Sequence, residues 1–165
     1  GQPPWAFLDL FRHMEKYGAV CVGSIYAFSL SGNYDEAEDG TWVSRKQLGE
    51  RNIVIKNRED ALKVMVELYL DRAINKAISF PQLKIPMMLM LVREFSCNGV
   101  TIHLNRGCEL FTSGVMEIRL ALQEKGIPVM TYEGNMADKR EIDEGQILDR
   151  LDSFMESLGL TKLES

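Results

Sequence analysis

The hydrophobic residues at the start of the chain predict a helix followed by a strand. Between residues 4 and 18 they recur every three or four positions, which is the spacing of one buried helical stripe that ends at Gly18. The members of that stripe are Phe7, Leu8, Phe11, Met14 and Tyr17. Residues 19–26, AVCVGSIY, are a short run rich in β-branched side chains, which is typical of a strand buried on both faces.

The middle of the chain is predicted to be a polar loop followed by two helices. Residues 29–51 contain several glycines and an acidic run, which favour turns over packing, and we assign no chemistry to them. Residues 59–79 carry an apolar stripe at helical spacing, with two acidic residues at the start, where a helix favours negative charge. A second helix is expected to begin at Pro81 and to end at residues 97–99.

The second half of the chain repeats the order strand, loop and helix twice. The strands are predicted at residues 99–104 and 127–132, and the helices at residues 112–125 and 143–158. Strands that alternate with helices require crossovers, so we predict a three-layer α/β fold with a short, mainly parallel sheet, similar to Rossmann or flavodoxin domains. Ligands of such sheets bind beyond the carboxyl ends of the strands, here in the loops that begin near Ala27, Asn105 and Glu133.

Composition and charge exclude several classes of protein. Apolar residues make up 45% and charged residues 26% of the chain, as in soluble globular domains. The formal net charge of -5 includes no basic cluster, which argues against nucleic acid as a partner. The longest nearly apolar stretch, residues 85–92, is too short to cross a bilayer, and nothing at the start resembles a secretory signal. We therefore expect a cytoplasmic protein without a membrane partner.

The length and the first residues predict how the chain is organised. A chain of 165 residues fits one ordinary domain. It begins with Gly1 rather than methionine, and no strand or helix cap precedes the first helix. We expect residues 1–165 to be a single α/β domain that has been cut from a larger subunit.

Cys108 is the strongest candidate for chemistry among the three cysteines. Cys21 lies within a predicted strand and Cys97 at a helix end, which are positions typical of packing residues. Cys108 directly follows a predicted strand and precedes a helix, so the positive end of that helix and the nearby Arg106 would favour its thiolate. This position predicts either a metal ligand or a nucleophile, and the spacing does not choose between them.

Two other polar features lie close to the same strand ends. His103 falls within a predicted strand and is expected to be a packed core residue. Residues 132–140, YEGNMADKR, form a polar loop at the end of the second strand. Asn135 or Asp138 either arranges the turn into the following helix or contributes to a site shared with Cys108.

The second half of the chain also resembles a known family. The run HLNRGCELFTSGVMEIRLALQEKGIPVMTYEGNMADKREID, followed by QILDRLDSFMESLGL, resembles the C-terminal domain of 2-hydroxyacyl-CoA dehydratase D-components and looks closest to class I benzoyl-CoA reductase subunits. The likeness is good over residues 99–160, and GQPPWAFLDLFRHMEKYGAVCVGSIY extends it more weakly to the start. Many members carry aspartate where this chain has Asn135, which favours the reductase-like branch.

The resemblance implies a two-domain subunit that holds a 4Fe-4S cluster between its halves, with an acyl-CoA thioester nearby. Cys108 stands where the C-terminal cysteine ligand belongs. The residues implied to lie near the cluster or the substrate are Asn105, Arg106, Glu133 and Asn135. The other ligands would come from an N-terminal domain of the same subunit, so the chain alone is expected to hold no cluster and to be inactive.

The chemistry implied by the resemblance is the transfer of a low-potential electron to a CoA thioester, which drives ring reduction or the removal of hydroxide. An ATP-hydrolysing iron–sulfur activator would supply the electron, and a second homologous subunit would complete the enzyme. The residues themselves leave two alternatives open. One is a non-enzymatic, flavodoxin-like regulatory or scaffold domain, and the other is an enzyme that uses Cys108 as its nucleophile.

Overall fold

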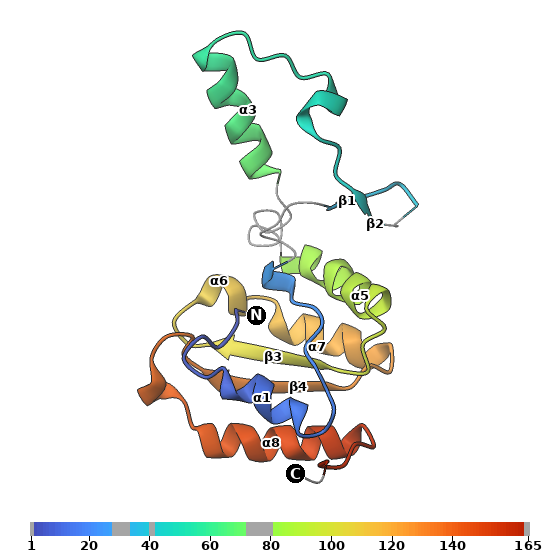
Figure 1. Cartoon of the computed structure of the whole chain (residues 1–165), viewed down its shortest axis with the longest axis vertical. Coiled ribbons are helices and arrows are strands. Elements are labelled where there is room, and N and C mark those ends of the chain that lie inside the picture. The colour runs from blue at the N-terminus through green and yellow to red at the C-terminus, as the bar shows by residue number, and fades with distance from the viewer. Residues whose placement is uncertain (1, 28–33, 40–41, 72–80, 164–165) are drawn as a thin grey trace.

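The centre of the molecule is a two-stranded parallel sheet (Figure 1). The computed structural model describes residues 2–27, 34–39, 42–71 and 81–163. β3 (Val100–Asn105) pairs with β4 (Val129–Gly134), and the register sets the last residues of the two strands opposite each other. Both carboxyl ends therefore meet at one edge of the sheet. The predicted short parallel sheet is confirmed, with each strand displaced by one or two residues along the chain.

One face of the sheet is covered by α5 (Lys84–Glu94) and α7 (Val115–Glu124) (Figure 1). Ile102 of β3 and Leu122 of α7 are each 1% exposed and pack in one hydrophobic cluster. α5 contributes Met87, Met88, Met90 and Leu91 to the same cluster. Burial of each such side chain contributes about 1.5–3 kcal/mol, which is enough to hold both helices on this face.

The opposite face is covered by α1 (Asp9–Glu15) and α8 (Glu144–Ser157) (Figure 1). Leu10 of α1 and Leu151 of α8 are fully buried in a second cluster. α8 begins where predicted because the Asp143 carboxylate accepts a hydrogen bond of 3.0 Å from the Gln146 backbone N–H and so caps its first turn. Helix, sheet and helix make the three layers that the sequence predicts.

The helix predicted at residues 112–125 is interrupted in its first part. α6 (Glu109–Thr112) is a single turn, and α7 begins only at Val115. Ser113 has an extended backbone, and Gly114 has a φ of 76°, a left-handed conformation that glycine adopts without strain. Cys108 therefore precedes one isolated turn rather than a long helix. The helix predicted at residues 112–125 is thus confirmed as α7 with a later start, and Cys108 does not lie at its N-terminus.

The strand predicted at residues 19–26 is also wrong. Residues 19–24 have no regular secondary structure, and Val20 is 68% exposed. The segment runs along the open edge of β3, separated from it by a cavity of about 420 Å³ that Val20, Thr101 and His103 help to line. The β-branched composition is compatible with a strand, but a strand also requires hydrogen bonds to a neighbour, which this segment does not make to β3 in the part of the chain that the structure describes.

Residues 34–71 lie apart from the α/β body (Figure 1). The loop predicted at residues 29–51 contains a short antiparallel hairpin, formed by β1 (Tyr34–Glu36) and β2 (Trp42–Ser44), and the 3-10 helix η1 (Leu48–Arg51). Residues 28–33 and 40–41 of this region lie outside the described residues.

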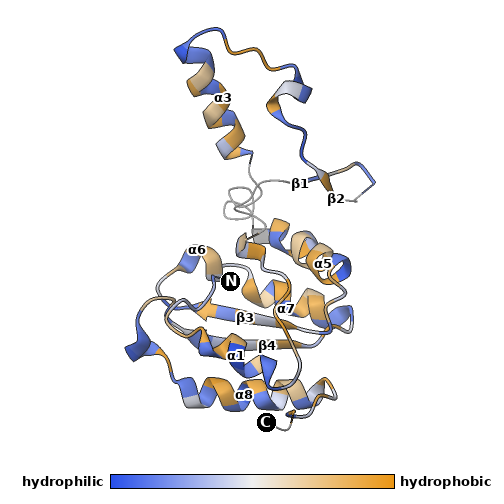
Figure 2. Cartoon of the chain, in the orientation of Figure 1, coloured by the Kyte–Doolittle hydropathy of each residue, from blue (hydrophilic) through white to orange (hydrophobic). Residues whose placement is uncertain are grey.

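The helix predicted at residues 59–79 is confirmed for its described part, α3 (Arg58–Leu70). No residue of α3 is buried, although Figure 2 shows apolar bands along it. Leu62 is 50% and Met65 is 64% exposed. The apolar stripe found in the sequence thus predicts the helix correctly, and in the described part of α3 its side chains are not buried. The remaining predicted turns, residues 72–79, lie outside the described residues.

The second predicted helix is confirmed in a modified form. The 3-10 turn η2 (Pro81–Leu83) comes first, and α5 continues from Lys84. Within the described ranges, no helix is both long and apolar enough to cross a membrane.

Candidate functional site

The loops that follow β3 and β4 are joined at one edge of the sheet. Asn105, the last residue of β3, is only 3% exposed. Its side-chain oxygen accepts a hydrogen bond of 3.1 Å from the backbone N–H of Met136, and the backbone N–H of Arg106 donates one of 3.0 Å to Gly134 O. The two loops therefore lie side by side at one edge, as expected, and buried Asn105 is the residue that connects them; that they form one functional site stays a prediction.

The N-terminal segment lies against both loops. Gln2 accepts a hydrogen bond at Oε1 from the side-chain amide of Asn105, and its Nε2 lies 3.9 Å from the sulfur of Cys108. The backbone N–H of Ala6 donates to Met136 O at 2.9 Å. We did not single out Gln2 from the sequence, because a polar residue before two prolines carries no periodic signal. The chain thus brings its second residue to the candidate site across more than a hundred positions.

His103 supports this edge from within the core, as predicted. It is 4% exposed and stacks on Tyr132, with ring centroids 5.0 Å apart. Its Nδ1 lies 2.9 Å from Gln2 O, and because a carbonyl only accepts, Nδ1 carries the proton. Burial lowers the pKa of His103, so the ring is neutral at pH 7. His103 therefore positions Gln2 and does not reach Cys108.

Cys108 is held by its backbone on both sides. Its N–H donates to Asn105 O at 3.1 Å, and its carbonyl accepts hydrogen bonds from the N–H and the hydroxyl of Thr112, at 3.3 and 3.1 Å. In the described part of the chain, no imidazole or carboxylate contacts the sulfur, although a cysteine nucleophile normally requires such a base. The side chain is partly exposed, so a ligand can reach it.

The arginine expected beside the cysteine is directed elsewhere. Arg106 Nη2 lies 3.0 Å from Glu133 Oε2, and these two side chains are 58% and 59% exposed. Exposed ion pairs contribute about 0–1 kcal/mol. The expectation that Arg106 favours the Cys108 thiolate is not supported by this geometry, because its guanidinium group is engaged by Glu133 at the surface.

A different cation lies beneath the cysteine loop. Lys84, the first residue of α5, is 4% exposed, and its ammonium donates to Leu110 O at 3.1 Å and to Ser113 O at 2.8 Å. Burial lowers the pKa of Lys84, and the electrostatic influence of Cys108 acts in the opposite direction. We did not predict this residue. The available signal was its spacing, because Lys84 shares one face of the helix with Met88 and Leu91 at intervals of four and seven residues.

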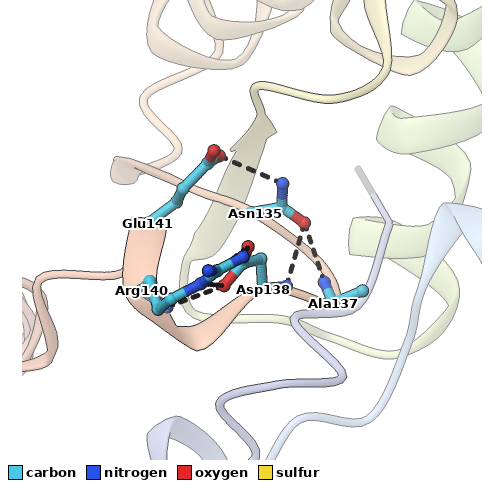
Figure 3. A network of polar contacts seen from close by, with 5 residues as sticks. All are labelled: Asn135, Ala137, Asp138, Arg140 and Glu141. Atoms are coloured by element: carbon cyan, nitrogen blue, oxygen red, sulfur yellow. Dashed lines mark hydrogen bonds and ion pairs between the residues drawn. The ribbon is translucent and has the colours of Figure 1, made fainter.

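The loop after β4 is organised by Asn135 (Figure 3). Its side-chain oxygen accepts hydrogen bonds from the N–H groups of Ala137 and Asp138, at 2.9 and 3.1 Å, and its amide donates to Glu141 at 3.1 Å. The Asp138 carboxylate accepts from the backbone and side chain of Arg140, and these bonds lower the pKa of Asp138. These contacts agree with the alternative that Asn135 or Asp138 arranges this turn, and a contribution of the loop to a site stays a prediction.

A polar depression of about 790 Å³ lies between this loop and α8. Its cationic side chains each already contact an acceptor. The pairs are Arg106 with Glu133, Lys139 with Glu144, Arg140 with Asp138, and Arg150 with Thr131 O. The depression therefore offers no unpaired cation among the described residues that line it, and we assign no anionic ligand to it.

The described residues do not include a complete set of metal ligands around Cys108. They contain no group of three or more histidine, cysteine, aspartate or glutamate side chains arranged to hold a metal. Cys97 precedes β3, at the opposite end of that strand from Cys108, and Cys21 lines the cavity beside Cys97. Because a 4Fe-4S cluster normally takes four thiolates, Cys108 fits as a single ligand whose companions lie outside the described residues.

Comparison with known proteins identifies the family. The family described as 2-hydroxyglutaryl-CoA dehydratase, D-component, matches residues 1–158. The (R)-2-hydroxyisocaproyl-CoA dehydratase alpha subunit of Clostridioides difficile is 33% identical over 162 residues, which are 94% of this chain and 32% of that protein. The (R)-2-hydroxyglutaryl-CoA dehydratase subunit alpha of Acidaminococcus fermentans is 29% identical over 160 residues, which are 96% of this chain and 28% of that protein.

A shorter match has a higher sequence identity. The (R)-phenyllactyl-CoA dehydratase alpha subunit of Clostridium sporogenes is 35% identical over 81 residues, which are 48% of this chain and 20% of that protein. The chain thus spans between 20% and 32% of the length of these relatives. Both strand-end loops, including Cys108 and Asn135, fall within the family match. The chain belongs to the 2-hydroxyglutaryl-CoA dehydratase D-component family.

Proposed function

We propose that this chain is the cluster-binding C-terminal domain of an alpha-type subunit in an enzyme that removes water from a 2-hydroxyacyl-CoA. The family match over residues 1–158 carries this proposal, because it includes both loops of the candidate site. The relatives from three genera are each named as the alpha subunit of a dehydratase. A second, homologous subunit is the partner that this naming suggests.

Within this function, Cys108 binds one iron of a 4Fe-4S cluster. Three features support this role: the sulfur lies beyond the carboxyl end of β3, the cysteine backbone is held by Asn105 and Thr112, and the side chain is accessible. The other thiolates come from the rest of the subunit. When bound, such a cluster supplies a low-potential electron to the CoA thioester, and an ATP-hydrolysing iron–sulfur activator reloads it.

The residues around Cys108 have supporting roles in this proposal. Asn105 fixes the cysteine loop to the loop after β4, so that both face the cluster and the substrate together. Gln2 directs its amide N–H toward the sulfur, and such hydrogen bonds tune the potential of iron–sulfur centres. Asn135 shapes the loop after β4, and Arg106 and Glu133 form its exposed rim.

We propose dehydration rather than aromatic ring reduction. The resemblance of the sequence to benzoyl-CoA reductases favours reduction, but the similar proteins named above are dehydratase subunits. The two reactions use the same class of thioester and differ in the acyl group.

The decisive assay uses the full-length subunit with its companion subunit and activator under anaerobic conditions. Phenyllactyl-, lactoyl-, 2-hydroxyisocaproyl-, 2-hydroxyglutaryl- and benzoyl-CoA are supplied in parallel with ATP. We expect a 2-enoyl-CoA from at least one hydroxyacyl-CoA and no consumption of benzoyl-CoA. Reduction of benzoyl-CoA, with all four hydroxyacyl-CoA thioesters unchanged, would assign the reductase function instead.

A further inference from the structure

Lys84 is a buried charge at a position where an apolar residue would pack without a desolvation penalty. Its neighbours on α5, Met87 and Met88, belong to the hydrophobic cluster between this helix, α7 and the sheet. Lysine is seldom buried to 96% unless its charge is paired, because removing an ammonium from water is costly. In the described part of the chain, its hydrogen-bond partners are two backbone carbonyls and no carboxylate. The acidic side chain close enough to act on its charge is Cys108, which raises the pKa of Lys84 against the larger effect of burial.

The two carbonyls belong to the turn that Cys108 begins. α6 is too short to satisfy its own carbonyl groups, and Gly114 then takes the chain away in a left-handed conformation. The Lys84 ammonium donates hydrogen bonds to Leu110 O and Ser113 O. The Thr112 hydroxyl donates to the carbonyl of Cys108 within the same turn. Lys84 thus links the turn that carries Cys108 to α5.

We propose that Lys84 is a positioning residue for the cluster ligand Cys108, which holds the turn that carries the cysteine by its hydrogen bonds to Leu110 O and Ser113 O and adds a positive charge near the cysteine. This inference rests on the proposed cluster-binding function. A cluster ligated by four thiolates is an anion, and its reduction adds a further negative charge. A buried ammonium close to one ligand stabilises the reduced form and so raises the reduction potential.

The test compares Lys84→Gln, which keeps N–H donors but loses the charge, with Lys84→Arg, which keeps both, in the full-length subunit. An exposed lysine that pairs with Glu144, Lys139, gives the matched control Lys139→Gln. The midpoint potential of the cluster is measured by anaerobic titration followed by electron paramagnetic resonance. We expect a more negative potential for Lys84→Gln, recovery toward the wild-type value for Lys84→Arg, and no change for Lys139→Gln.

A second measurement addresses the hydrogen bonds and does not need a cluster. In cluster-free subunit, Lys84→Met should raise the amide hydrogen-exchange rates of residues 109–115 by at least about tenfold, because two hydrogen bonds from a charged donor are lost. If Lys84→Met does not fold, exchange is compared between wild type and Lys84→Gln, for which we expect a smaller rise in the same residues.

The outcomes separate this inference from the proposed function. If the wild-type subunit binds no iron, the cluster-binding function fails, and a role of Lys84 in tuning a cluster fails with it. If the wild type binds a cluster but folded Lys84→Gln keeps the wild-type potential, only the electrostatic role of Lys84 is overturned. Unchanged exchange at residues 109–115 in both neutral variants would overturn the positioning role.

Discussion

The side-chain oxygen of Asn105 accepts a hydrogen bond from the backbone N–H of Met136 at 3.1 Å, and this contact joins the loops that follow the two central strands. The other end of the same amide donates to Gln2. A buried polar group that loses its partner costs about 1–3 kcal/mol. We therefore expect Asn105→Ala to lower the free energy of unfolding of the chain by about 2–4 kcal/mol, because groups on both loops lose their partner.

Equilibrium urea unfolding measures this effect, and Arg106→Ala is the neighbouring control. The Arg106 side chain is more than half exposed and pairs with Glu133 at the surface, so its removal should change the free energy of unfolding by less than about 1 kcal/mol. Equal effects of the two substitutions would contradict the role of Asn105 as the buried connection between the loops.

Gly99 packs directly beneath α8. A Cβ atom at this position would lie 2.8 Å from the Phe154 ring and 3.4 Å from Leu158. Gly99→Ala should therefore destabilise the chain by about 1–3 kcal/mol through overpacking. Gly49, which has no atom within 4 Å of an added Cβ, provides the control Gly49→Ala, for which we expect almost no loss. Thermal unfolding followed by circular dichroism compares the two variants.

The carboxylate of Asp152, on α8, contacts polar groups from distant parts of the chain. His13 Nε2 lies 2.5 Å from its carboxylate and Lys162 Nζ lies 2.7 Å away. Burial alone would raise the pKa of Asp152, but the hydrogen bonds from Lys162, His13 and Tyr17 prevail and lower it from 3.8 to about 2. The folded state thus binds this proton more weakly than the unfolded state. The resulting stabilisation is present above pH 4 and is lost as the pH falls from about 4 to 2.

The free energy of unfolding measured between pH 2 and pH 6 tests this direction of the pH dependence. We expect the wild type to lose stability below pH 4 more steeply than Asp152→Asn, because the variant has no carboxylate to protonate at this position. Asp149→Asn, a change at an exposed position of the same helix, is the control for replacing a carboxylate on α8. A steeper slope in Asp152→Asn than in the wild type would contradict the assignment.

The core and the apolar stripe of α3 should respond differently to truncation. Leu151 is fully buried between α8 and the sheet, whereas Leu62 of α3 is 50% exposed. In the 165-residue chain, Leu151→Ala should cost about 2–5 kcal/mol. Leu62→Ala should cost less than about 0.5 kcal/mol, and urea unfolding compares the two. A large loss from Leu62→Ala would show that α3 packs against the body of this chain.

The sequence predicts the second half of the fold well because its signals there are local. β3 and β4 are short apolar runs that follow Gly99 and Gly126, and each leads into a polar loop and a helix. Once two such units are recognised, the helix that crosses over between the strands makes them parallel, so their carboxyl ends lie at the same end of the sheet. That topology explains why Asn105, at the end of β3, lies beside the loop that contains Asn135.

Other features depend on contacts between distant residues and were therefore missed. Residues 19–24 have the composition of a strand, but their hydrogen bonds depend on a neighbour 80 positions away. The contact of Gln2 with the cysteine loop leaves no periodic pattern in the sequence. The break at Gly114 and the burial of Lys84 each carry a local signal, an internal glycine and a lysine within an apolar stripe, which we gave too little weight.

The iron and acid-labile sulfide content of the full-length subunit tests the central claim most directly. The subunit is prepared anaerobically as the wild type, as Cys108→Ala and as the control Cys97→Ala, which changes the thiol at the opposite end of β3. Folding of all three is checked by circular dichroism. We predict that the wild type and Cys97→Ala contain about four iron and four sulfide ions per subunit, and that folded Cys108→Ala loses most of both. A Cys108→Ala subunit that retains the wild-type iron and sulfide would contradict the role of Cys108 as a cluster ligand.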